Sequence, residues 1–274
     1  VFLYLLNKNN KFLLMKSFFI KFACLSFIFF MSFKPSVPDF QGQAYYFSKS
    51  SMDLGTWGAR MSEEQKKEAQ ARLKNRLEKS YILSFNKEES IFKEEDKVDA
   101  ISGATDSWGS NFTRGEQYKN VKENRLVQSQ EFYGKRFLVK DSLNSIPWKM
   151  GKETKKIGQY LCFKATASIP TSELSWYDFS WNDLRETEQK DDSTQPAEVK
   201  MTSVEAWYTL QIPVNNGPAE YWGLPGLILE VSAGNTTILC SKIILNPKEK
   251  LVILAPDKGK EITKKDYQST IQEK

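Results

Sequence analysis

The chain has 274 residues, among them 39 basic residues, 34 acidic residues and no histidine. The absence of histidine excludes a Ser-His-Asp or Cys-His catalytic pair and any histidine-ligated metal site. The first 37 residues hold five lysines and no acidic residue, so the body that follows carries 34 residues of each sign. A neutral body argues against a nucleic-acid surface, which needs a concentrated basic patch. We therefore expect no cofactor, no metal and no nucleic-acid partner.

Residues 1–37 have the pattern of a secretory leader. Met15 is the predicted start, Lys16 and Lys21 form a basic region, and an apolar run of twelve residues follows at 22–33. A run of this length is typical of a signal peptide and is too short to span a bilayer comfortably. We expect an exported protein, periplasmic or associated with the outer membrane, without a transmembrane span once the leader is removed.

The first half of the body predicts a helix among strands. Ser62 and Gln65 form a capping box, which predicts one long surface helix lying on a sheet. The segment at 99–115 is rich in Ser, Gly and Thr and predicts a loop. Apolar and aromatic runs predict strands at 41–49, 81–85, 90–93, 116–124, 125–133 and 135–141.

The second half predicts further strands and one short helix. Gly151 and Lys152 stand in a predicted loop, and the acidic segment at 183–200 reads as a surface-loop insertion. Thr263 and Asp266 cap a short C-terminal helix. Strands are predicted at 160–167, 204–214, 227–232, 236–245 and 251–254.

These elements lack a βαβ rhythm, which indicates a mainly β fold with a minor α+β character. We expect residues 38–274 to form a single β domain, an antiparallel sheet curled into a sandwich, a barrel or a half-barrel.

The corner Gly-Leu-Pro-Gly at 223–226 leads into a short apolar run. Pro225 suits the second position of a tight turn, and Gly226 is predicted to take the positive φ that a type II turn needs next. The plain interpretation is a turn that begins a core strand. The alternative is that Tyr221 and Trp222 form an exposed aromatic binding lip.

The predicted mature body has two cysteines, Cys162 and Cys240. An even pair in an exported chain suggests one disulfide. The alternative is two separate buried thiols, because a sequence does not show whether the two Cα atoms come close enough for a bridge.

The hexapeptide GLPGLI at 223–228 resembles the family of exported proteins that is named for it, also called Porph_ging. The resemblance includes the motif Ala-Trp-Tyr-Thr at 206–209, Ile212-Pro213 and Gly217-Pro218, in the family's order. It implies an envelope protein of Gram-negative bacteria that works beside an outer-membrane transporter. It brings no known activity and no catalytic residues. The surface that we predict for binding comprises the signature residues Trp207, Tyr208, Pro213, Gly217, Pro218, Tyr221, Trp222, Gly223, Leu224, Pro225 and Gly226.

Three functions follow as hypotheses. The first is a non-catalytic binding or accessory module, which partners an outer-membrane transporter or carries an apolar ligand in a lined cavity. The second is an enzyme that works with carboxylates and without histidine, which needs two acids facing each other in a cleft. The third is a purely structural envelope protein.

Overall fold

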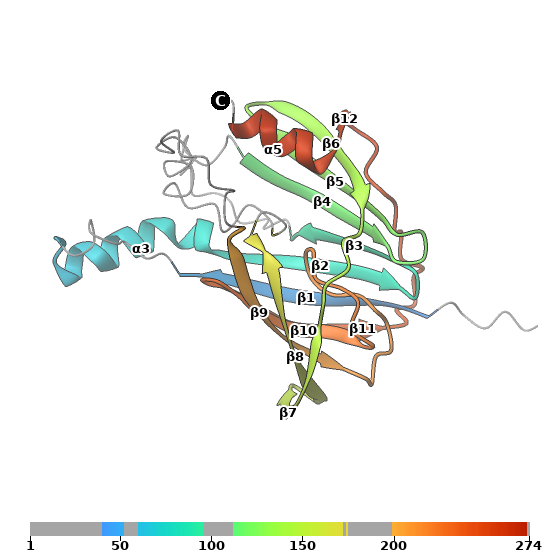
Figure 1. Cartoon of the computed structure of the whole chain (residues 1–274). Coiled ribbons are helices and arrows are strands. Elements are labelled where there is room, and N and C mark those ends of the chain that lie inside the picture. The colour runs from blue at the N-terminus through green and yellow to red at the C-terminus, as the bar shows by residue number, and fades with distance from the viewer. Residues whose placement is uncertain (1–39, 52–59, 96–111, 172–173, 175–198, 273–274) are drawn as a thin grey trace, which may run out of the picture. The chain divides into compact units, whose positions relative to one another are not determined.

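The computed structural model describes five parts of the chain, namely 40–51, 60–95, 112–171, 174 and 199–272. These residues form twelve strands and two helices (Figure 1). The predicted leader at 1–37, with its Met15 start, lies outside the described residues. So does nearly all of the predicted acidic insertion at 183–200.

The elements follow one another in the chain with short connections in most places. The helices are α3 (Glu63–Leu77) and α5 (Lys264–Gln272). The strands are β1 (Gln41–Ser50), β2 (Glu78–Asn86), β3 (Glu89–Glu94), β4 (Phe112–Asn120), β5 (Arg125–Phe132), β6 (Lys135–Ser142), β7 (Lys149–Ile157), β8 (Tyr160–Pro170), β9 (Met201–Thr209), β10 (Leu227–Ala233), β11 (Thr236–Leu245) and β12 (Lys260–Ile262).

All twelve strands belong to one sheet, in the order β12-β6-β5-β4-β3-β2-β1-β11-β10-β9-β8-β7. Neighbouring strands are antiparallel, except that β12 runs parallel to β6. The outermost strands β12 and β7 do not pair with each other, so the sheet is open. The prediction of a mainly β fold is confirmed. The sandwich and the closed barrel are wrong because there is a single open sheet, and a half-barrel is compatible with it.

The two helices begin where their caps predict. The Ser62 N–H donates to Gln65 Oε1 at 2.9 Å, and the Gln65 N–H donates to Ser62 Oγ at 3.2 Å, which completes the capping box of α3. The prediction of one long surface helix is not supported, because α3 has 15 residues and the chain passes from Leu77 directly into β2. At α5, the Asp266 N–H donates to Thr263 Oγ1 at 3.1 Å. Of the helices in the described parts of the chain, neither is long and apolar enough to cross a membrane.

Three strand assignments from the sequence are wrong. The segment around Gly151 and Lys152 is strand β7, whose exposed, lysine-rich residues hide the usual alternation. Strand β4 begins at Phe112, within the segment predicted as a loop. Residues 251–254 form no regular element and do not pair with the sheet. An edge strand has a neighbouring strand on one side only, and an unpaired segment has none. Their sequences therefore show little of the apolar–polar alternation by which a strand is predicted.

The two faces of the sheet are covered differently. We call the face that carries Tyr46 and Phe85 the inner face, and the opposite one the outer face. Strand β9 ends at Thr209 rather than at 214, and residues 210–226, here called the signature segment, cover the inner face. Ile212 and Leu224 of this segment are fully buried in the main core cluster together with residues of β1 and β2.

Two smaller clusters complete the packing. Helix α5 packs on β6 through Tyr267, whose ring centroid lies 5.3 Å from that of Phe137. On the outer face, Tyr118, Val127 and Leu138 form an apolar patch that is covered by residues 253 and 255. The chain after β11 therefore crosses the outer face before it returns as β12.

Gly226 is required for a reason different from the predicted one. The positive φ of the corner belongs to Gly223, at +92°, and not to Gly226. A Cβ at Gly226 would lie 2.0 Å from the carbonyl oxygen of Thr209. The corner therefore passes against the end of β9, and glycine is needed there because the two backbones touch.

The two glycines offer a test of this correction. We expect Gly226→Ala to lower the free energy of unfolding by about 3 kcal/mol or more, because the new methyl group collides with rigid backbone. We expect Gly223→Ala to cost about 1 kcal/mol, since its Cβ has space and only the positive φ is unfavourable. Urea unfolding of both variants measures the difference. An equal cost for both substitutions contradicts the close approach at Gly226.

Candidate functional site

The signature residues are mostly buried. Pro213, Gly223 and Pro225 are exposed and Trp222 is half-buried. Seven others are buried, namely Trp207, Tyr208, Gly217, Pro218, Tyr221, Leu224 and Gly226. The alternative of an exposed lip is wrong for Tyr221, which is 5% exposed. The role of the other residues in binding stays a prediction.

Trp207 is surrounded by charged side chains from β7, β8 and β9. The Lys155 ammonium lies 4.3 Å from the centroid of the Trp207 ring, and the indole N–H donates to Glu205 Oε1 at 2.9 Å. Lys155 also contacts Glu230 at 2.8 Å. The Lys164 ammonium beside Glu205 holds the pKa of that carboxyl below its ordinary value. The ring and its N–H are thus used within the sheet, which favours a structural role for Trp207.

Two tryptophans tie the signature segment to the chain before β7. The Trp148 indole N–H donates to the carbonyl of Trp222 at 2.8 Å, and the Trp222 indole N–H donates to the carbonyl of Asn144 at 3.0 Å. Each buried or half-buried indole thereby satisfies its only donor. The aromatic side of the corner is fixed in place rather than free.

Lys119 on β4 holds the far side of the signature segment. This lysine is fully buried, and its ammonium donates to the carbonyl oxygens of Gly217 at 2.7 Å, Ala219 at 2.7 Å and Tyr221 at 3.1 Å. An ammonium has three donors, and all three are directed at this segment. Ala219 has a φ of +48°, an uncommon value for a residue with a side chain, which is consistent with a backbone bent around the ammonium.

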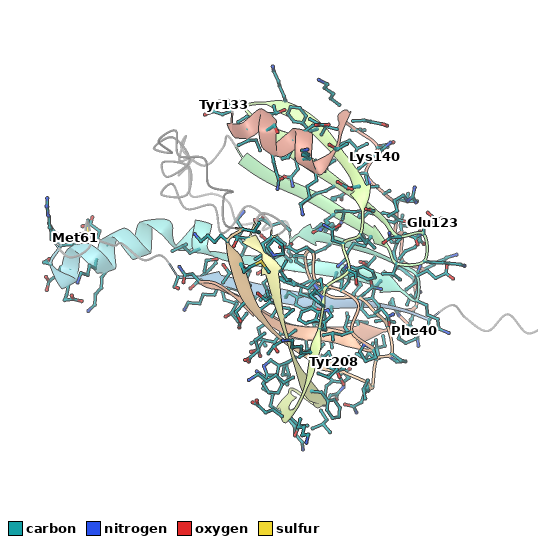
Figure 2. The ribbon with its side chains drawn as sticks, viewed as in Figure 1. Phe40, Met61, Glu123, Tyr133, Lys140 and Tyr208 are labelled. Atoms are coloured by element: carbon teal, nitrogen blue, oxygen red, sulfur yellow. The ribbon has the colours of Figure 1, made fainter. Side chains whose placement is uncertain are left out.

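The signature segment therefore spans much of the inner face. It starts and ends at β9 and β10, and four strands, β11, β1, β2 and β3, lie between β10 and β4 in the sheet. Asn216 in the segment accepts a hydrogen bond from Ser90 Oγ at 3.0 Å. Tyr46 in β1 donates to the carbonyl of Ile228 at 2.7 Å. The contacts of Ser90 and Lys119 tie β3 and β4 to one connection, and Tyr46 ties β1 to the start of β10, the strand that follows this connection. Figure 2 draws the side chains of the sheet and of the segments packed on it as sticks.

Cys162 and Cys240 are both buried free thiols, so of the two alternatives the separate thiols are found and the disulfide is not formed. Cys162 is on β8 and Cys240 on β11, with two strands between them. Along a sheet this separation is about 14 Å, whereas a disulfide needs Cα atoms within about 7 Å. Burial raises the pKa of the Cys162 thiol to about 11 and that of Cys240 to about 12.

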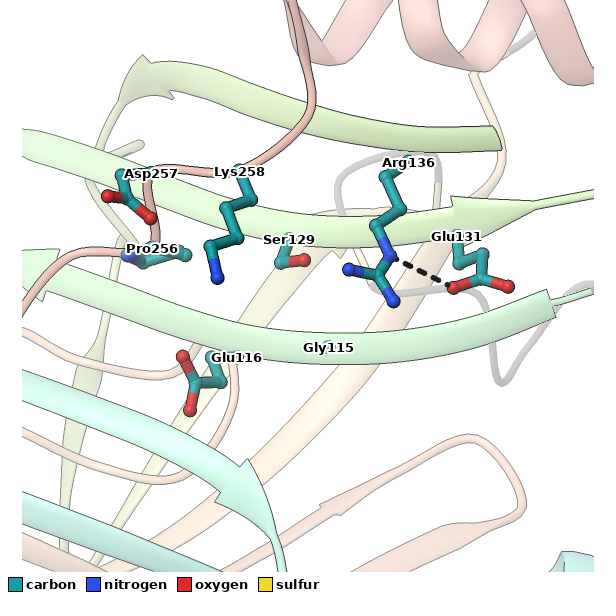
Figure 3. Close-up of a pocket in the computed structure, with 8 residues that line it drawn as sticks. All are labelled: Gly115, Glu116, Ser129, Glu131, Arg136, Pro256, Asp257 and Lys258. Carbon is teal, nitrogen blue, oxygen red and sulfur yellow. Dashed lines mark ion pairs between the residues drawn. The ribbon is translucent and has the colours of Figure 1, made fainter. Parts of the chain in front are cut away.

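A polar pocket opens on the outer face, where strand β4 has a bulge. Arg114 pairs with Gln130 and Gln117 with Gln128, so that two residues of β4 stand opposite the single residue Ser129. The pocket has a volume of about 360 Å³. Its lining, shown in Figure 3, comprises Gly115, Glu116, Ser129, Glu131, Arg136, Pro256, Asp257 and Lys258.

The bulge needs a small residue and reverses the side-chain alternation of β4. A Cβ at Gly115 would lie 2.8 Å from the Ser129 carbonyl oxygen, so glycine lets the two strands stay close. After the bulge, Gln117 and Lys119 face inward, and Glu116 faces the pocket on the outer side. The bulge in β4 thus places Lys119 on the inner face and Glu116 on the outer face.

Charged groups in the pocket are only partly paired. Arg136 Nε lies 3.5 Å from Glu131 Oε2, the ion pair drawn in Figure 3. Within the described residues, the side chains of Glu116, Asp257 and Lys258 make no hydrogen bond or ion pair. Glu116 is half-buried, and its carboxylate has no partner among the described residues. These groups are available to a bound polar ligand.

Sequence reasoning did not find this pocket. Its residues come from β4, β5, β6 and the segment before β12, which are far apart in the chain. Two weak signals were present, Gly115 near the start of a predicted strand, which can mark a bulge, and the turn-forming Pro256-Asp257. No metal-binding group of His, Cys, Asp and Glu is found in the described residues.

A sequence model of the family described as "Protein of unknown function (Porph_ging)" matches residues 148–230. The resemblance seen in the sequence is confirmed over this stretch. The Porph_ging stretch contains β7, β8, β9, the signature segment and the start of β10. Lys119 and Ser90, which hold the signature segment, lie outside it.

Other comparisons find distant likeness. Two structures of PNGF-II, in space groups C2 and P21, give TM-scores of 0.47 and 0.45 at 15% sequence identity. The similarity covers 85% of this chain but only 32% and 33% of the PNGF-II chain, so this chain spans about a third of that length. No curated protein matches the sequence.

The anchoring role of Lys119 can be tested by substitution. We expect Lys119→Met to lower the free energy of unfolding by about 3 kcal/mol, because three carbonyls lose a charged donor. Lys122→Met is the matched control. It removes an exposed lysine three residues further on, in the turn after β4, and should change stability little. Chemical unfolding curves measure both. Equal stability of the two variants contradicts the anchoring role.

The thiols predict a pH dependence. An unfolded cysteine has a pKa of about 8.5, whereas the folded thiols of Cys162 and Cys240 have pKa values of about 11 and about 12. Stability from these protons is complete below pH 8.5 and is lost as the pH rises through the folded pKa values, since the unfolded state ionises first. We expect the unfolding free energy of the wild type to fall more steeply between about pH 9 and pH 11 than that of Cys162→Ala/Cys240→Ala. Parallel curves would rule this out.

Proposed function

We propose that the protein is a non-catalytic binding module of the bacterial cell envelope and that the pocket at the β4 bulge is its recognition site. The observation that carries the proposal is the set of unpaired groups in this pocket. Glu116 and Asp257 offer carboxylates, Lys258 offers an ammonium, and Ser129 offers a hydroxyl. A cavity of about 360 Å³ falls within the usual range for ligand sites.

Several features favour a polar ligand over an apolar one. The lining of the pocket is charged or polar apart from Gly115 and Pro256. The inner face, where a curled sheet would carry an apolar molecule, is packed with buried side chains such as Leu224 and Ile228. A segment of an outer-membrane transporter, the partner that the family resemblance implies, can present polar and charged groups of this kind.

The pocket favours binding over catalysis. The carboxylate hypothesis needs two acids that face each other in a cleft, so that one holds a proton and the other does not. Here Glu131 is paired with Arg136, and Asp257 is exposed to solvent. Acid–base chemistry is therefore the weaker hypothesis for these residues.

The proposal is tested by thermal unfolding of the purified protein with three sets of compounds, which are soluble peptidoglycan fragments, envelope oligosaccharides and short peptides. A compound that binds only the folded state raises the melting temperature. We expect at least one set to do so, and we expect the shift to disappear in Glu116→Gln/Asp257→Asn.

Glu64→Gln, at an exposed glutamate in the first turn of α3, is the matched control and should keep the full shift. No shift with any set, or an equal shift in the pocket variant and the control, overturns the proposal.

A further inference from the structure

The chain just before the pocket has the burial pattern of a strand. We call residues 251–255 the strap. Its side chains alternate, since Leu251, Ile253 and Ala255 are half-buried, whereas Val252 is 74% exposed and Leu254 is 69% exposed. Alternation of this kind is the pattern of an extended strand that lies on a surface.

The inward side chains of the strap hold it on the outer face of the sheet. Ile253 and Ala255 pack against the patch formed by Tyr118, Val127 and Leu138, which come from β4, β5 and β6. At its start, the Leu251 N–H donates to Gln41 Oε1 at 2.9 Å. The strap is thus fixed in position by apolar contacts and by one anchor at its end.

Beyond Leu251, the main chain of the strap has no partner in the described parts of the chain. From Val252 to Ala255, no N–H or C=O group makes a hydrogen bond to any described residue. The sequence predicts a strand here, and the alternation in burial agrees with it, but the strap pairs with no strand in the described parts of the chain. Exposed main-chain groups of an extended segment form a template on which another strand can pair.

The edges of the sheet offer a poorer template. Strand β12 has only three residues, and β7 carries Lys149, Lys152 and Lys156 in exposed positions and a bulge between Met150 and Thr154. Short length, lysines and bulges are the usual protections of an edge against pairing. The strap, at five residues, is longer than β12, carries no lysine and presents two large exposed aliphatic side chains.

The strap leads directly into the pocket. Residues 256–258 continue it and form one wall, and Figure 3 shows Lys258 reaching from this wall toward the strand that carries Glu116. The unpaired carboxylates of Glu116 and Asp257 lie in the lining. A ligand that runs along the strap would therefore place its next side chain beside two carboxylates, which favour a cation.

We propose that the strap and the pocket together bind an extended peptide segment of another protein. The segment pairs with the main chain of residues 252–255, lays apolar side chains beside Val252 and Leu254, and places a lysine or arginine in the pocket. This inference rests on the proposed function, because it takes the pocket as the recognition site and adds the class of its ligand.

The test uses fluorescent ten-residue peptides that alternate valine and threonine and carry a lysine at one end or the other. Binding to the full chain is followed by fluorescence anisotropy. We expect saturable binding with a Kd below about 1 mM. Two further peptides carry N-methyl groups on alternate residues, in the two possible registers.

A strand that pairs through one of its edges uses the N–H groups of every second residue. One N-methylated peptide should therefore bind about tenfold more weakly or worse, and the other should bind nearly as well as the parent. Replacing the peptide lysine with glutamate should also weaken binding about tenfold, and Glu116→Gln/Asp257→Asn should remove most of that difference. Glu64→Gln should leave every value unchanged.

Three outcomes overturn the inference. The first is no saturable binding up to about 1 mM. The second is that both N-methylated peptides bind as tightly as the parent peptide, or that both bind equally more weakly. The third is a dimer of the chain alone in sedimentation that Leu254→Asn abolishes, since a second copy would then occupy the strap. The proposed function is judged separately, because it stands or falls with the shifts in melting temperature that depend on Glu116 and Asp257.

Discussion

The fully buried ammonium of Lys119, bound to three carbonyls of the signature segment, is the constraint on which the inner face depends. The segment starts and ends at β9 and β10, so its contact with β4 spans most of the sheet. A buried charge is costly unless its donors are all satisfied, and this one is satisfied by backbone that has no regular partner of its own. The lysine and the segment thus stabilise each other.

This arrangement separates the two faces of the sheet. Ser90 and Lys119 direct their polar groups at the signature segment, and Tyr46 donates to Ile228 just after it. The apolar side chains of the segment complete the core. On the outer face, the charges of the pocket and the main chain of residues 252–255 in the strap lack partners among the described residues. The bulge at Gly115 and Glu116 links them, because it sets Lys119 inward and Glu116 outward. A packed inner face and an outer face with polar groups available to a ligand are consistent with the proposed binding module.

Local chemistry could be predicted from the sequence, and long-range contacts could not. The capping box of Ser62 and Gln65, the cap at Thr263 and most strands follow from neighbouring residues and are confirmed. The sequence did not reveal strand β7 because an edge strand needs no alternation of apolar and polar residues. The need for glycine at 226 could not be explained from the sequence, because it arises from close contact with Thr209. Lys119 looks like any surface lysine in the sequence, and the pocket joins distant segments. Both depend on the order of strands, which local patterns do not encode.

Native-state hydrogen exchange tests the central claim most directly, that the signature segment is a locked part of the core and not a mobile binding loop. The N–H groups of Gly223 and Ile228 donate within this region, whereas those of Val252 and Leu254 have no partner among the described residues. The account predicts that Gly223 and Ile228 exchange as slowly as amides in β1 and β2, and that Val252 and Leu254 exchange fast. Fast exchange at Gly223 and Ile228, at the rate of the strap, would contradict it.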